Sequence, residues 1–92
     1  MPLLSDEEIE GGLRSLSGWS REGDAIRKQF KRGDFAGSVE FVNAVTPLAE
    51  EMNHHPDLAI SWDTVTVSLS THSQGGITEN DIELAAKIDA LG

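Results

Sequence analysis

Two short stretches in which every second residue is apolar constrain the fold more than any other feature of the chain. Apolar side chains recur with this spacing over residues 58–62 and again over residues 65–69, and Asp63-Thr64 separates the two stretches. A period of two residues is typical of a strand that buries one face. The sequence therefore predicts two half-buried antiparallel strands joined by a tight turn, with Trp62 packed in the core.

Capping motifs predict a helix near each end of the chain. In Ser5-Asp6-Glu7-Glu8 the serine and the last glutamate have the spacing of a capping box, and apolar residues follow at helical spacing. We therefore expect a first helix over residues 6–16. Near the other end Thr78 is followed by Asp81 three residues later, which predicts the start of a last helix that runs to Ala90.

A hairpin and a longer helix are expected between these two helices. Gly23-Asp24 is a turn pair within residues 19–31, although Lys28 interrupts the apolar face and leaves open which face is inward. From Phe41 onward, apolar residues repeat every three to four positions, which is the pattern of an amphipathic helix. Because proline removes a backbone donor, we expect a kink in this helix near Asn43–Pro47.

The expected order of elements is α-β-β-α-β-β-α, and this order defines the fold class. Strand pairs interleaved with helices indicate an α+β fold, in which the helices pack on one face of a four-stranded antiparallel sheet. The chain has 92 residues, 38% of them hydrophobic, which suffices for one core, and no repeat or linker divides it. We therefore expect a single domain over residues 1–92.

Composition argues against several classes of protein. The absence of cysteine excludes a disulfide framework, a thiolate zinc site and a cysteine nucleophile. A net charge of −9 repels phosphate backbones and anionic membranes, so we expect neither nucleic acid nor a membrane as a partner. No long apolar run and no signal peptide are recognisable, so a cytoplasmic location is expected.

All three histidines fall within 19 residues, in or beside predicted loops. His54 and His55 precede the predicted strand pair, and His72 lies just past its end. If the two strands are joined by a tight turn, Leu58 lies opposite Val67. The chain at His72 then returns towards the loop that carries the other two histidines. The three imidazoles are therefore expected to share one cleft.

Three interpretations of this cluster remain open. Three imidazoles can form a zinc site, but neighbouring residues of an extended chain point to opposite sides, which argues against His54 and His55 sharing an ion. General acid–base catalysis suits imidazoles at neutral pH better. The third interpretation is exposed loop histidines without a role. Because the histidines lie in or beside loops, their imidazoles are expected to bury little surface.

The histidines belong to a longer motif. It consists of Glu50, three residues, His54-His55-Pro56, five residues to Trp62, nine more to His72 and eight more to Asp81. This pattern resembles the signature of the pterin-4a-carbinolamine dehydratase family. The resemblance extends to Gly18-Trp19 and to residues 23–30, 34–35 and 69–72.

The resemblance implies a specific reaction. Enzymes of this family are hydro-lyases that dehydrate 4a-hydroxytetrahydropterin to the quinonoid dihydropterin, and so recycle the cofactor of the aromatic amino acid hydroxylases. They need no metal and no organic cofactor. The reaction needs an acid for the departing 4a-hydroxyl group and a base for the proton on N5, and imidazoles can serve as both.

The resemblance also assigns roles to residues. His54 and His72 would transfer protons on either side of the ring, and His55 would chiefly hold the pterin. Glu50 would complete the catalytic set by hydrogen-bonding an imidazole or the ring. The expected substrate contacts are His54, His55, Pro56, Thr71, His72, Ser73 and Gln74. Trp19 would either flank the pterin or pack on the first helix, and Asp81 is expected to support the loop at His72 from a helix N-terminus.

The resemblance also implies association of the chain, as a homodimer through edge strands or a homotetramer through the second helix. It further implies functional coupling to an aromatic amino acid hydroxylase. The small core and the unpaired sheet edges also favour association. The alternative function on the same fold is a non-catalytic dimerisation or assembly cofactor. Related proteins of that kind often lose the histidine set, which is complete here.

Overall fold

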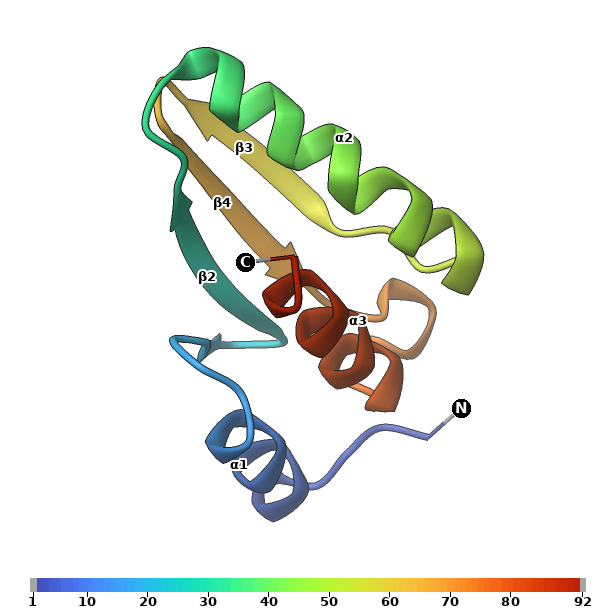
Figure 1. The fold of residues 1–92 in the computed structure, drawn as a ribbon. Helices are drawn as coiled ribbons and strands as arrows, with labels where there is room; N and C mark the ends of the chain where they lie inside the picture. Colours follow the sequence, from blue (N-terminus) through green and yellow to red (C-terminus); the bar gives the residue numbers. More distant parts are fainter. Residues whose placement is uncertain (1, 92) are drawn as a thin grey trace.

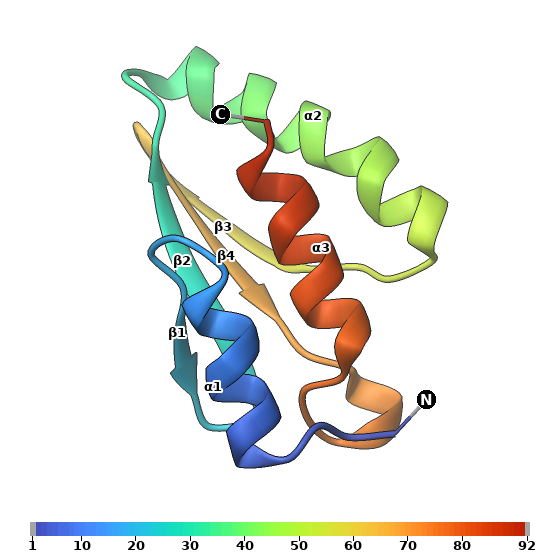
Figure 2. The same ribbon diagram turned by 60° about the horizontal axis from the view of Figure 1, so that its bottom comes forward.

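Three helices lie against one face of a four-stranded antiparallel sheet (Figures 1 and 2). The computed structural model describes residues 2–91. Its elements are α1 (Asp6–Arg14), β1 (Ser20–Glu22), β2 (Ala25–Lys31), α2 (Phe35–Met52), β3 (Asp57–Ser61), β4 (Thr64–Leu69), the 3-10 turn η1 (His72–Gln74) and α3 (Glu79–Asp89). The α+β fold class and the order of its elements are therefore confirmed.

Helix α1 begins at the capping box that the sequence predicts. The Ser5 hydroxyl accepts a hydrogen bond from the Glu8 N–H at 3.2 Å, and the Glu8 carboxylate accepts one from the Ser5 N–H at 2.8 Å. These two bonds satisfy backbone donors that the first turn of a helix leaves without partners. The helix ends at Arg14, two residues before the predicted end.

Helix α2 is continuous from Phe35 to Met52 and contains Pro47. Asp34 caps its start by accepting a hydrogen bond from the Gly37 N–H at 2.6 Å. Its end coincides with Asn53, which has a left-handed backbone conformation with φ +48°. The kink expected near Asn43–Pro47 stays a prediction.

The strands follow the order β1-β2-β4-β3, so β1 and β3 form the two edges of the sheet. Leu58 of β3 lies opposite Val67 of β4, which is the predicted register. Glu22 pairs with Ala25, so Gly23-Asp24 forms a two-residue turn between β1 and β2. Because β3 pairs with β4 along the whole length of β3, the start of β3 lies beside the end of β4.

The core lies between the sheet and the helices. Strand β4 contributes one complete face, since Val65, Val67 and Leu69 are fully buried. The other buried apolar side chains come from every helix, from β2 and from loops; they include Ile9, Trp19, Ile26, Phe30, Phe41, Val45, Ile77, Leu84 and Ile88. Alternating apolar residues in β4 thus bury one face of a central strand, as the sequence predicts.

Lys28 lies on the inward face of β2 although it is charged. Its ammonium group lies 2.9 Å from an Asp89 carboxylate oxygen, and it donates a hydrogen bond to the Ser17 carbonyl at 2.5 Å. Trp19 donates its indole N–H to the same Asp89 oxygen at 3.0 Å. The face that carries Ile26, Lys28 and Phe30 is therefore the inward one, because the end of α3 supplies a partner for the cation.

The prediction that Trp62 packs in the core is wrong. Ser61 pairs with Thr64, so Trp62-Asp63 forms the turn between β3 and β4, and Trp62 takes a left-handed conformation with φ +50°. Its side chain is 68% exposed. Strand β3 is likewise exposed throughout rather than half-buried, because it is an edge strand that the helices cover incompletely.

Candidate active site

Four segments of the chain meet at one end of the sheet. They are the end of α2, the loop between α2 and β3, the turn η1 that follows β4, and the first turn of α3. The left-handed conformation of Asn53 ends α2, and the His54 N–H donates to the Ala49 carbonyl at 3.0 Å. Pro56 then forces an extended conformation on the residue before it. The two adjacent histidines consequently diverge.

His54 turns inward and is bound to Asp81. Nε2 of His54 lies 2.5 Å from Oδ1 of Asp81, in the first turn of α3. Asp81 is completely buried, and His54 is only 9% exposed. This burial contradicts the expectation that a loop imidazole buries little surface, and the cause is a carboxylate that the sequence places 27 positions away.

The second oxygen of Asp81 is held by two further donors. Oδ2 accepts hydrogen bonds from the Thr71 hydroxyl and from the Thr78 backbone N–H, each at 2.9 Å. The hydroxyl oxygens of Thr71 and Thr78 lie 2.8 Å apart. Because the Thr71 proton is donated to Asp81, the Thr78 hydroxyl donates to Thr71. Asp81 therefore supports the loop before His72, as expected, and it also fixes His54.

This network determines the tautomer of His54. An ionised Asp81 can only accept hydrogen bonds, so Nε2 of His54, 2.5 Å from Oδ1, is assigned the hydrogen of this pair. In a neutral imidazole the other ring nitrogen then has no hydrogen. Nδ1 of His54 is therefore an acceptor, and the carboxylate behind the ring stabilises the cation that forms when Nδ1 takes a proton.

His55 turns outward and pairs with Glu50. Nε2 of His55 lies 2.5 Å from Oε2 of Glu50, and both side chains are more than half exposed. The pair borders a small cavity of about 160 Å³ between α2 and β3, which Pro56 and Leu58 also line. Glu50 thus contacts an imidazole, as the resemblance implies, and the imidazole is that of His55.

His72 lies at the start of η1 and is exposed. Its Nε2 lies 3.7 Å from a carboxylate oxygen of Asp57, the first residue of β3. The predicted return of the chain towards the His54-His55 loop is therefore confirmed. The cavity beside His55 is lined by neither His54 nor His72. The structure thus brings the three histidines to one end of the sheet but gives each a separate carboxylate partner.

The remaining predicted contacts divide into two groups. Ser73 and Gln74 are exposed in η1 beside His72, whereas the hydroxyl of Thr71 is buried and already bound to Asp81. Trp19 is buried against Phe30 and is hydrogen-bonded to Asp89 at the far end of α3. Asp89 lies about 12 Å along the helix from Asp81, since each residue adds about 1.5 Å. The structure therefore does not bring Trp19 together with the histidines of the same chain.

Sequence reasoning missed two partners. Asp57 was not a candidate, although its place directly after Pro56 puts it in the loop that His72 approaches. Thr78 appeared only as a helix cap, whereas it is fully buried and joins the network on Asp81. The signal for Asp57 was the β3–β4 register, because it sets the end of β4 beside the start of β3.

Within the described residues 2–91, no three His, Asp or Glu side chains come together in a group that could hold a metal ion. Over the same residues, no helix is long and apolar enough to cross a membrane.

Known proteins are similar to this chain over nearly its whole length. The relative from Mycobacterium tuberculosis, provisionally named pterin-4-alpha-carbinolamine dehydratase, is 47% identical over 99% of this chain and 97% of its own. The relative from Sulfolobus acidocaldarius, which carries the same provisional name, is 48% identical over 96% of this chain and 97% of its own.

Solved structures support the same assignment. A protein of Brucella melitensis described as a transcriptional coactivator/pterin dehydratase superposes with a TM-score of 0.92, at 36% identity over 97% of each chain. A pterin dehydratase-like protein identified as a RuBisCO assembly factor superposes with a TM-score of 0.64, at 26% identity over 79% of this chain and 84% of its own. The family model of pterin 4 alpha carbinolamine dehydratase matches residues 2–91. This chain belongs to that family.

Proposed function

We propose that this protein is a cytoplasmic hydro-lyase that dehydrates 4a-hydroxytetrahydropterin to the quinonoid dihydropterin and water, as a step in tetrahydropterin recycling. The observation that carries the proposal is the pair of His54 and Asp81. A buried carboxylate on Nε2 leaves Nδ1 as the proton-accepting atom of His54. A fixed imidazole of this kind is suited to general base catalysis.

The reaction removes a hydroxyl group from C4a and a proton from N5. In the proposed mechanism Nδ1 of His54 takes the N5 proton, and protonated His72 gives a proton to the 4a-hydroxyl, which leaves as water. A double bond forms between C4a and N5. The Asp81 carboxylate stabilises the His54 cation, and exchange with solvent then restores both histidines.

His55 and Glu50 hold the substrate in this proposal. Their side chains are exposed and border the small cavity between α2 and β3, where one edge of a flat ring can rest. Glu50 orients the imidazole of His55 by accepting a hydrogen bond from Nε2. Pro56, Ser73 and Gln74 then form the rim of the substrate site.

A dehydration assay tests the proposal. Purified protein is mixed with freshly generated 4a-hydroxytetrahydropterin, and the loss of its absorbance is followed against a buffer blank and against a heat-inactivated sample. We expect dehydration well above the blank. A rate equal to the blank, from protein with a folded circular dichroism spectrum, would overturn the proposal.

The second candidate is a non-catalytic assembly cofactor. It is favoured by two structural relatives, one described in part as a transcriptional coactivator and one identified as a RuBisCO assembly factor. The complete set of Glu50, His54, His55 and His72 favours the enzyme. An inactive but folded protein that forms a homodimer would favour the cofactor instead.

Association is part of both proposals. Edge strand β3 exposes Leu58 and Ile60 at 36% and 40%, and an edge strand with apolar side chains invites a second strand. We therefore propose a homodimer, or a homotetramer if α2 also associates. Functional coupling to an aromatic amino acid hydroxylase follows from the proposed reaction alone, because such enzymes produce its substrate.

A further inference from the structure

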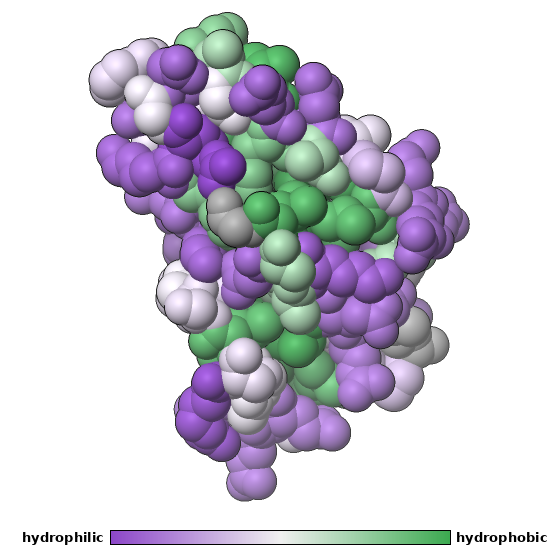
Figure 3. All heavy atoms as spheres, in the orientation of Figure 1, coloured by the Kyte–Doolittle hydropathy of each residue, from purple (hydrophilic) through white to green (hydrophobic). Residues whose placement is uncertain are grey.

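A groove between α1 and α3 lies on another part of the surface from the histidines. It has a volume of about 490 Å³, and its apolar lining comes from Leu4, Leu16, Ile82 and Ala86. A second cavity of about 270 Å³ continues it past Leu4 towards Pro2. Figure 3 shows hydrophobic surface exposed between the regions of α3 and α1, with hydrophilic residues on both sides.

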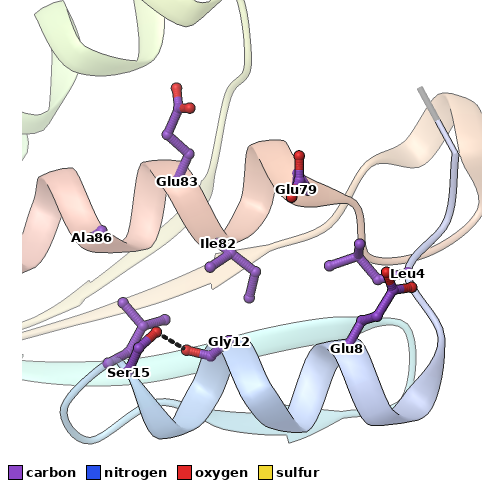
Figure 4. Close-up of a pocket in the computed structure, with 9 residues that line it drawn as sticks. Leu4, Glu8, Gly12, Ser15, Glu79, Ile82, Glu83 and Ala86 are labelled. Carbon is purple, nitrogen blue, oxygen red and sulfur yellow. Dashed lines mark hydrogen bonds between the residues drawn. The ribbon is translucent and has the colours of Figure 1, made fainter.

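Close contact between the helices forms the floor of the groove. A Cβ atom on Gly12 of α1 would lie only 2.9 Å from a methyl carbon of Ile82 of α3, so glycine at this position lets the helices approach. Figure 4 shows Ile82 pointing from α3 towards α1. The groove is therefore a consequence of helix packing, with an apolar floor that both helices share.

Acidic side chains border the groove. Glu8 projects from α1, and Glu79 and Glu83 project from α3 (Figure 4). Lys87 lies 3.9 Å from Glu83, a distance at which an exposed pair contributes little. Among residues 2–91, the hydrogen bond that Glu8 accepts comes from the backbone N–H of Ser5 in its own helix cap. With a net charge of −9 on the chain, the border of the groove stays strongly negative.

We propose that this groove docks a basic amphipathic helix of a partner protein. Glu79 to Ala86 span about 10 Å of α3, which matches about two turns of a bound helix. Apolar residues of that helix, three or four positions apart, would contact Ile82 and Ala86. Lysine or arginine side chains beside them would face the glutamates. An acidic helix or a nucleic acid would be repelled by the same charges.

Fluorescence anisotropy with a labelled synthetic peptide tests the docking surface. The probe is a leucine–lysine peptide of about 14 residues with one apolar stripe at helical spacing. One control is a scrambled peptide of the same composition, and the other has glutamate in place of lysine. We expect the probe to bind more tightly than the scrambled peptide and the glutamate peptide not to bind.

Matched variants locate the binding. The double change Glu79→Gln and Glu83→Gln removes two charges at the groove, and we expect it to weaken binding about tenfold. The control, Glu10→Gln with Glu40→Gln, removes two exposed charges elsewhere and should leave the affinity within about twofold of wild type. Ala86→Phe should block binding by filling the groove, while the dehydratase rate stays unchanged.

Two outcomes would overturn the proposal. One is an equal loss of peptide affinity in the Glu79/Glu83 variant and in the Glu10/Glu40 control variant. This result would mean that the overall negative charge of the protein attracts the peptide. The other is equal affinity for the striped and the scrambled peptide, which would mean that the apolar floor has no role. Circular dichroism of each variant shows whether a loss of binding reflects unfolding, and the Gln variants stay informative if Ala86→Phe does not fold.

Discussion

Nε2 of His54 lies 2.5 Å from Oδ1 of Asp81, although one residue stands in a loop and the other in the first turn of α3. The contact joins two parts of the chain that the sheet brings together. It fixes the direction in which the imidazole presents its free nitrogen, so the chemistry proposed for His54 depends on Asp81.

Asp81→Asn tests this dependence. An amide can present its NH₂ group to Nε2 and so favour the opposite tautomer of His54, and we expect the dehydration rate to fall at least tenfold. Stability should fall by about 2–4 kcal/mol, because a buried network loses its charge. The ¹⁵N chemical shifts of His54 should show the change of tautomer.

Glu83→Gln, on the exposed side of the same helix, is the control. Unchanged shifts and rate in folded Asp81→Asn would contradict the role of Asp81.

Glu50→Gln tests the outer histidine pair. Both Glu50 and His55 are mostly exposed, so the loss of the charge should leave the free energy of unfolding almost unchanged. We expect KM for the pterin to rise several-fold with a smaller effect on kcat, because His55 loses its orientation. Glu51→Gln changes the neighbouring acid, which contacts Lys87 instead, and should behave as wild type. A fall in kcat at constant KM would assign Glu50 to catalysis rather than to binding.

Chelation tests the expectation that the site works by proton transfer alone. Dialysis against EDTA and then phenanthroline should leave the dehydration rate unchanged, because the proposed steps use only imidazole and carboxylate groups. Metal content before and after dialysis is measured by plasma mass spectrometry. Stoichiometric zinc that leaves together with the activity, and restores it on return, would contradict the mechanism.

The edge strand β3 predicts association. We expect light scattering at micromolar concentration to give at least a dimer mass, since Leu58 and Ile60 are exposed on an unpaired edge. Salt should strengthen the oligomer, because each chain carries a net charge of −9. Ile60→Lys should shift the mass towards the monomer, whereas a change at the exposed last residue of β2, Lys31→Ala, should not. A monomer mass at every salt concentration would contradict the prediction.

Local patterns predicted most of the fold. The period-two spacing of residues 65–69 is reliable because β4 is central and buries one face completely. The same spacing misled at Trp62, because alternation continued into the turn, where the backbone becomes left-handed. Lys28 stayed ambiguous since its partner, Asp89, is 61 positions away.

The site shows the same division between local and distant information. The opposite directions of His54 and His55 follow from extended backbone between a helix end and Pro56. The burial of His54 does not follow from the local backbone. It depends on Asp81, which is separated from His54 along the chain by two strands and a turn. A capping signal identified Asp81 as the third residue of a helix, but only the tertiary structure shows which imidazole its side chain meets.

The measurement that tests the account most directly is the dehydration rate of His54→Ala, His72→Ala and the double variant. Each single change should lower the rate by about 10²-fold or more, and the double change should cost less than the product of the two. His54→Ala should also lower stability by about 1–3 kcal/mol, because it leaves Asp81 without a buried partner, whereas exposed His72→Ala should not. Wild-type rates in both folded single variants would contradict histidine acid–base catalysis in this protein.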